Sequence, residues 1–147
     1  MGWVTDLHGK TVGLDTAPLI YFIEQRQDYV DVVRPFFKAV ARGDCQVVTS
    51  TVTLLEVLVH PLRRGDESLA QKYNDILLSS PNITTVPVTP IIAQEAAQLR
   101  ADHSLKTPDA IQVATALGRR THAFLTNDRD IPDIAGLKVL RLRDLLP

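Results

Sequence analysis

At 147 residues the chain has the length of one ordinary domain, and its composition, 45% apolar and 22% charged, is typical of a globular protein. A net charge of −1 excludes a protein that coats nucleic acid through a strongly positive surface. We expect a cytoplasmic protein without a membrane partner, because apolar runs stay far short of the roughly 18 residues of a membrane span, the start lacks a secretory signal, and the single Cys45 excludes an internal disulfide.

The chain begins with a ten-residue extension, residues 1–10, which includes Trp3 and to which the sequence assigns no role. Thr11–Asp15 has the apolar run of a short buried strand. Thr16 is placed to cap the helix that follows, and Pro18 suits the first turn of that helix.

The clearest helical pattern lies between Tyr29 and Val40, where apolar residues recur at spacings of three and one. Gly43 stands where a glycine commonly ends a helix. Pro35 falls inside this pattern, so we expect a kink there or a second helix start near Arg34.

The rest of the chain alternates between strands and helices. Gln46–Ser50 is a second strand, and Ser50 or Thr51 is placed to cap a helix that Pro61 should limit. Asp66 opens the next helix. The remaining signals predict strands at 83–88, 122–126 and 138–142, and helices that open at 89–90 and 107–108.

Strands separated by one or two helices require crossover connections, which favour parallel neighbours and cover a sheet with helices. The sequence contains no internal repeat, low-complexity run or linker. It therefore predicts a single α/β domain with a mostly parallel sheet of four to five strands, flanked by helices on both faces.

Four acidic residues occur where this pattern ends a strand or begins a helix: Asp15, Glu56, Asp109 and Asp128. In an open α/β fold these points can converge on one edge of the sheet. Three of the acids also have an ordinary explanation, since Asp15 can cap a helix, Asp109 suits the positive end of a helix dipole, and Asp128 can lie in a turn. Glu56 is harder to explain in this way, because Leu and Val on both sides indicate a largely buried helix.

Carboxylates brought close together repel one another, and a divalent cation between them makes their charged forms tolerable. Oxygen ligands favour Mg²⁺ or Mn²⁺, and the chain has no set of His and Cys at zinc-binding spacing. A cation held in this way can orient a phosphodiester and lower the pKa of a bound water. The four acids therefore indicate hydrolytic phosphodiester chemistry.

A resemblance to a known family rests on four stretches of the chain: Leu14–Tyr21, Thr53–Val57, Pro108–Ala116 and Phe124–Asp130. Together they resemble the PIN-domain nucleases and, more narrowly, the VapC-type toxins of prokaryotic toxin–antitoxin pairs. The match runs in order from about residue 11 to the C-terminus. No member of the family's acidic quartet is missing.

This resemblance implies a nuclease that cleaves single-stranded RNA with Mg²⁺ or Mn²⁺, forms a homodimer, and is inhibited by an antitoxin that plugs its pocket with a basic residue. Its catalytic and metal-binding quartet matches Asp15, Glu56, Asp109 and Asp128. Its hydroxyl positions near the metal match Thr16 and Thr126.

Other residues near these motifs have less specific interpretations. Asp130 is either an outer-sphere acid or a solvated loop residue. Lys106 and Arg129 are the cations nearest the proposed pocket in sequence, and so the expected substrate contacts. Tyr21 can stack on a base or belong to the core. Ile131 stands where the family usually has an aromatic residue, which we interpret as a change in packing.

Two other functions stay open at this point. One is a PIN-like nuclease that acts in RNA maturation or on DNA, without an antitoxin. The other is a metal-binding interaction domain that has lost hydrolysis. A receiver-type phosphoacceptor is disfavoured, because no lysine follows a strand end at the required place.

Overall fold

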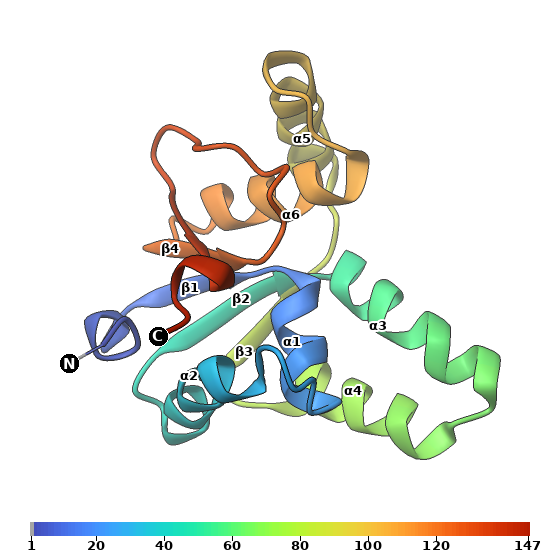
Figure 1. Cartoon of the computed structure of the whole chain (residues 1–147). Coiled ribbons are helices and arrows are strands. Elements are labelled where there is room, and N and C mark those ends of the chain that lie inside the picture. Colours follow the sequence, from blue (N-terminus) through green and yellow to red (C-terminus); the bar gives the residue numbers. More distant parts are fainter. Residues whose placement is uncertain (1) are drawn as a thin grey trace.

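The computed structural model describes residues 2–147, which form one sheet with helices on both faces (Figure 1). The described strands are all parallel and lie in the order β3-β2-β1-β4-β5, with the bounds β1 (Thr11–Leu14), β2 (Gln46–Ser50), β3 (Ile83–Val86), β4 (Ala123–Thr126) and β5 (Lys138–Arg141). The described α-helices are α1 (Thr16–Ile23), α2 (Val30–Arg42), α3 (Thr51–Arg64), α4 (Glu67–Ser79), α5 (Pro90–Asp102) and α6 (Thr107–Gly118). The predicted α/β fold is confirmed, with five strands and no antiparallel member among these elements.

The sheet separates two hydrophobic cores. Helices α1, α2 and α4 pack with one face of the strands, and α5 and α6 with the other (Figure 1). Successive strand residues alternate between these cores, as Phe124 and Leu125 of β4 show. No helix within residues 2–147 has the length and apolar character that crossing a membrane requires.

Helix α6 lies very close to the central strand β1. A Cβ atom built on Gly13 would lie 2.8 Å from the Ala116 Cβ atom and 3.0 Å from a ring carbon of Phe124. A distance below 3.0 Å is one that real Cβ atoms essentially never show. The absent side chain at Gly13 and the small one at Ala116 therefore permit direct packing of α6 on β1.

Both internal prolines lie inside continuous helices, so the predicted helix limit at Pro61 and the alternative of a restart near Arg34 were wrong, whereas the alternative of a kink at Pro35 stays a prediction. Helix α2 continues through Pro35 with no restart near Arg34, and α3 continues through Pro61 to Gly65, the residue that ends it in a left-handed conformation. A proline removes one backbone hydrogen bond. In α2 the buried face that includes Phe36 outweighs this loss. The predicted helix end at Gly43 is confirmed, with φ 82°.

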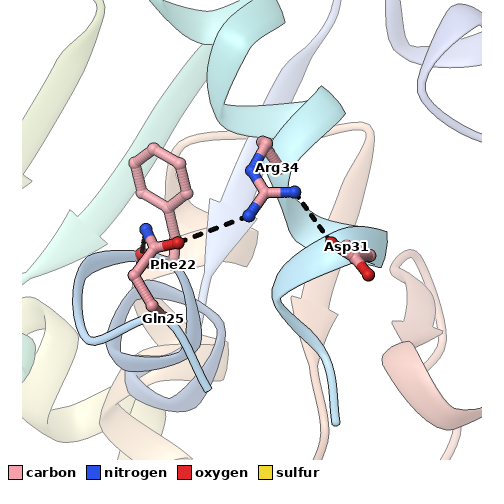
Figure 2. Close-up of polar contacts among 4 residues, drawn as sticks. All are labelled: Phe22, Gln25, Asp31 and Arg34. Carbon is pink, nitrogen blue, oxygen red and sulfur yellow. Dashed lines mark hydrogen bonds and ion pairs between the residues drawn. The ribbon is translucent and has the colours of Figure 1, made fainter. Parts of the chain in front are cut away.

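Polar contacts fix the turn between α1 and α2 (Figure 2). Gln25 has a positive φ of 54°, and its Nε2 donates to the Phe22 carbonyl over 3.0 Å. Arg34 donates to Gln25 Oε1 over 3.3 Å and to Asp31 Oδ1 over 2.7 Å. Arg34 thus joins the end of α1 to the first turn of α2.

The described part of the N-terminal extension packs against α2. The Trp3 ring stacks on Phe36 with a centroid distance of 5.7 Å, and Leu7 of the short 3₁₀ helix Thr5–Leu7 is buried in the same core. Trp3 therefore has a packing role that the sequence did not indicate.

Candidate functional site

An open cavity lies at the carboxyl ends of β1 and β4, which are neighbours at the centre of the sheet. Asp15 directly follows β1, Asp128 follows β4, Glu56 lies on α3 and Asp109 lies in the first turn of α6. All four acids line this cavity. The strand order reverses between β1 and β4, and such switch points are where open α/β sheets bind ligands.

Asp15 is the most firmly held of the four acids. It is the N-cap of α1, and its Oδ1 accepts from the Thr16 amide over 2.9 Å. Its Oδ2 accepts from the Thr126 hydroxyl over 2.7 Å. Burial raises the pKa of Asp15, and these two hydrogen bonds oppose that rise. Thr16 is the first residue of the helix, so the prediction that it caps the helix was wrong.

Glu56 is held by the neighbouring helix. Its Oε1 accepts from the Thr16 hydroxyl over 2.7 Å. The expectation that α3 is largely buried was wrong, because Leu55 is 65% exposed and Glu56 itself is half-buried. The Leu and Val residues around Glu56 are not all core residues, since an amphipathic helix turns some of them toward solvent.

A buried polar network beneath the cavity orients Glu56. Gln112 of α6 donates through its side-chain amide to the hydroxyls of Thr53 and, over 3.4 Å, of Thr16. Its Oε1 accepts from the Ser50 hydroxyl over 2.7 Å. The Gln112 network therefore joins α6 and the β2–α3 junction to Thr16, which in turn holds Glu56.

The direction of these hydrogen bonds follows from counting hydrogens, since each hydroxyl has one to donate. Thr49 donates to the Leu14 carbonyl over 2.8 Å, so Thr53 must donate to Thr49 over their 2.8 Å contact. Thr16 donates to Glu56, so the 3.3 Å contact between the Thr16 and Thr53 hydroxyls cannot be a hydrogen bond. The network thus makes Thr16 a dedicated donor to Glu56.

Asp109 and Asp128 form the other side of the cavity. Burial, followed by the negative charges of the other acids, raises the pKa of Asp109 to about 7. Asp128 accepts at Oδ1 from the Asp130 amide over 2.8 Å, and its own amide donates to Thr126 over 3.0 Å. The close approach of the acids is therefore unfavourable while all of them are ionised.

Of the remaining predicted residues, some line this cavity and others do not. Asp130 and Arg129 are exposed and line it, whereas Lys106, exposed at the N-cap of α6, does not. The Tyr21 ring stacks on Tyr29 with a centroid distance of 4.8 Å. Tyr21 is thus already part of the packing between α1 and α2.

Two polar residues that line the cavity were not predicted as site residues, Asn127 and Arg143. Asn127 is buried, and its Nδ2 donates to the Tyr21 hydroxyl over 3.2 Å. Arg143 lies in the 3₁₀ helix Leu142–Asp144 that follows β5. Asn127 could have been found from its place between Thr126 and Asp128, but no motif marks Arg143.

The four carboxylates of the cavity suit a hard divalent cation, because oxygen ligands are the ones such a cation prefers. Their negative charges contribute to the raised pKa of Asp15 and of Asp109. Within residues 2–147, no three His, Cys, Asp or Glu side chains are already arranged to hold a metal ion. The fit to Mg²⁺ or Mn²⁺ is therefore one of ligand chemistry and charge, and the side chains would have to draw together around the ion.

A family model for the PIN domain matches residues 12–137, so the chain belongs to the PIN-domain family. The family assignment made from the four sequence stretches is thereby confirmed. Among curated protein sequences, none matches this chain significantly.

Solved structures of toxin–antitoxin systems have the same fold. A chain of VapBC2 from Rickettsia felis, bound to a promoter DNA fragment, has a TM-score of 0.69 and 16% identity, and the match covers 89% of this chain and 98% of that one. A toxin–antitoxin complex from Klebsiella pneumoniae gives 0.65 and 25%, covering 90% and 97%. The sarcin–ricin loop cleaving toxin VapC20 of Mycobacterium tuberculosis gives 0.63 and 18%, covering 78% and 86%.

Proposed function

We propose that this protein is a metal-dependent endoribonuclease that cleaves single-stranded RNA as the toxin of a type II toxin–antitoxin pair. The observation that carries the proposal is the convergence of Asp15, Glu56, Asp109 and Asp128 on one cavity of a PIN domain. PIN domains are typically nucleases and usually depend on a metal. The supported ligand is Mg²⁺ or Mn²⁺.

In the proposed reaction Asp15, Asp109 and Asp128 would hold the first cation. When bound, Mg²⁺ or Mn²⁺ supplies positive charge to a phosphoryl oxygen and lowers the pKa of a bound water. Glu56 accepts a hydrogen bond through Oε1 only, among residues 2–147. Its Oε2 is therefore available to complete the metal shell or to accept a proton from the attacking water.

Thr16 and Thr126 act as the supporting hydroxyls of this site. Thr126 donates to Asp15, and Thr16 donates to Glu56. Hydrogen bonds to an ionised carboxylate favour its charged form, which is the form that binds a cation. Both threonines thus orient an acid, and the Thr126 hydrogen bond opposes the rise in the pKa of Asp15.

The RNA substrate and the antitoxin partner in this proposal are taken from proteins of similar structure. The structure from Klebsiella pneumoniae is a toxin–antitoxin complex, and VapC20 is described as cleaving the sarcin–ricin loop. We extend both features to this chain, together with a homodimeric state. The RNA target and the cut site are matters of loop contacts, which differ between proteins of one fold.

Cleavage mapping on total RNA tests the activity. The purified protein should cut at defined positions in Mg²⁺ or Mn²⁺ and should not cut in EDTA. The Asp15→Asn variant, assayed as a folded protein, should leave the same RNA intact. Full cleavage by this variant would contradict the assignment of the metal site.

Expression in cells tests the biological role. Induction of the protein should arrest growth, and co-expression of a small partner encoded beside it should relieve the arrest. RNA or DNA cleavage without growth arrest would instead favour a nuclease that works without an antitoxin. Tight Mn²⁺ binding with no cleavage of single-stranded RNA would favour a non-hydrolytic interaction domain.

A further inference from the structure

Arg143 lines the acidic cavity, although it lies in none of the four sequence stretches that carry the family resemblance. Its backbone amide donates to Asn127 Oδ1 over 3.2 Å, and its Nη2 donates to the Asn127 carbonyl over 2.9 Å. Asn127 is itself buried and bound to Tyr21. Asn127 thus anchors both the backbone and the guanidinium of Arg143, which lines the same cavity as Asp128.

The guanidinium of Arg143 retains donors that the protein does not use. Its Nε is buried and has no hydrogen-bond partner within residues 2–147. No ion pair in the same part of the chain joins Arg143 to a carboxylate, although five acids, Asp130 included, line the cavity with it. A buried donor without an acceptor costs about 1–3 kcal/mol. The Nη1 atom of Arg143 also has no hydrogen-bond partner within residues 2–147 and is not among the fully buried atoms, so it is the donor that an acceptor entering the cavity can reach.

Arg141, two residues earlier, differs from Arg143 because its guanidinium contacts a carboxylate of the protein. Its Nη2 donates to the Ile131 carbonyl over 2.6 Å, and the same atom lies 3.4 Å from Asp133 Oδ1. Arg141 is therefore both anchored and neutralised, and it does not line the cavity. The guanidinium of Arg143 also donates to a backbone carbonyl, but within residues 2–147 it has no ion-pair partner.

A phosphodiester that approaches this cavity meets five carboxylates, which repel it. A guanidinium opposes this repulsion and presents several N–H groups in a plane that matches the oxygens of a phosphate. We propose that Arg143 is the phosphate-binding residue of this cavity and contacts a backbone phosphodiester of the bound strand. This proposal rests on the nuclease function proposed above.

Binding measurements test the proposal without the complication of cleavage. Each variant is made in an Asp109→Asn parent, and its affinity for a short labelled single-stranded RNA of random sequence is measured by fluorescence anisotropy in Mg²⁺. Arg143→Gln should weaken binding by about tenfold or more, equivalent to about 1.4 kcal/mol. It should also lower the slope of log affinity against log salt by about 0.7, the contribution of one phosphate contact on a single strand.

Two further variants separate charge from local structure. Arg143→Lys should keep the salt slope of the parent, because it keeps the charge, and should lose part of the affinity with the fork geometry. Arg141→Gln, the matched control, should leave affinity and slope unchanged. The same losses are expected with a DNA strand of the same sequence, because a phosphate contact does not involve the 2′-hydroxyl. A loss confined to RNA would overturn the phosphate assignment.

A measurement on the parent itself covers the case in which Arg143→Gln fails to fold. The Nε–H resonance of Arg143, assigned by its loss in Arg143→Lys, should shift when RNA is added, while that of Arg141 should not. An unshifted resonance at saturating RNA would overturn the proposal, as would a folded Arg143→Gln variant with the parent's salt slope. If the Asp109→Asn parent binds RNA, either of these results contradicts only the role of Arg143, and the proposed nuclease function survives. A parent that binds no RNA contradicts both the nuclease function and the role of Arg143.

Discussion

The two sides of the acidic cavity are built differently. Asp15 and Glu56 accept hydrogen bonds from the Thr16 amide, the Thr126 hydroxyl and the Thr16 hydroxyl. Asp109 lies partly buried near the charges of Asp15 and Asp128, and burial and these charges raise its pKa, whereas Asp128 accepts a hydrogen bond from the Asp130 amide. On one side the fold therefore orients both acids, whereas on the other Asp109 is held against electrostatic repulsion. This difference indicates that the fold alone orients the first pair, and that a cation would stabilise the second pair most.

The largest expected effect is a loss of catalysis, and it comes from the side of the cavity formed by Asp109 and Asp128. Asp109→Asn should reduce RNA cleavage by at least about 1,000-fold, equivalent to about 4 kcal/mol of lost transition-state stabilisation, because a proposed metal ligand is removed. Cleavage rates of the purified variants in Mg²⁺ measure this loss.

Asp130→Asn is the matched control, since Asp130 lines the same cavity but is exposed. We expect it to lose less than about tenfold. A loss of about 10–100-fold would identify Asp130 as an outer-sphere acid of the site. Equal activity of Asp109→Asn and the unmodified protein would remove Asp109 from the metal shell.

The next largest effect tests the preorganised side. Gln112→Leu removes the partner of the Ser50, Thr53 and Thr16 hydroxyls. It should lower the free energy of unfolding by about 1–3 kcal/mol, because buried polar groups lose their hydrogen bonds. It should also reduce kcat by about 10–100-fold with little change in KM, because Glu56 loses its orientation through Thr16. Chemical denaturation and steady-state cleavage kinetics measure the two effects.

Thr115→Val provides the control on the same helix. The Thr115 hydroxyl is buried and donates to the Ile111 carbonyl, outside the Gln112 network. This variant should change stability slightly and leave kcat unchanged. A Gln112→Leu protein with normal kcat would show that the network supports the fold without orienting Glu56.

The smallest effect concerns stability and pH. The folded-state pKa of Asp109 is raised to about 7 from an ordinary value of 3.8, so the folded protein binds this proton more tightly than the unfolded chain. The free energy of unfolding in EDTA should therefore rise as pH falls from about 8 through about 7 toward about 5.5, by of order 1 kcal/mol after allowance for solvent screening. Denaturation at several pH values measures this change.

Variants on the two sides should change this stability in opposite directions. Asp109→Asn should be more stable than the unmodified protein near pH 8 and should lose most of the pH dependence, because it removes a repelling charge. Asp15→Asn should be less stable by about 1–2 kcal/mol, since Asn keeps one acceptor oxygen where Asp15 uses two, and its amide nitrogen cannot accept from Thr16 or Thr126. Destabilisation by both variants at this pH would contradict the difference between the two sides.

Much of the fold and the four acids could be predicted from local signals. The strand Gln46–Ser50 has the predicted bounds, and the side chains of Asp66 and Thr89 accept hydrogen bonds from backbone amides where helix starts are expected. Asp15 and Asp128 were predictable because polar residues directly follow apolar strands. Parallel strands bring such residues to one edge of a sheet, so their proximity follows from topology.

Other features depend on tertiary packing that local sequence does not encode. The helices continue through Pro35 and Pro61 because burial of their apolar faces outweighs a lost backbone bond. Gln112 lies in an apolar stretch of α6, and only the structure shows the hydroxyls it meets. Arg143 reaches the cavity because β5 returns beside β4, a pairing between segments that no motif connects.

The contact between Gly13 and Ala116 has a consequence for the acids that neither residue touches. Asp15 is two residues beyond Gly13 on one element, and Asp109 is seven residues before Ala116 on the other. The short distance between β1 and α6 therefore limits how far apart the Asp15 and Asp109 carboxylates can lie. Two of the smallest side chains of the core, Gly13 and Ala116, thus help to set the distance between two charges of the cavity.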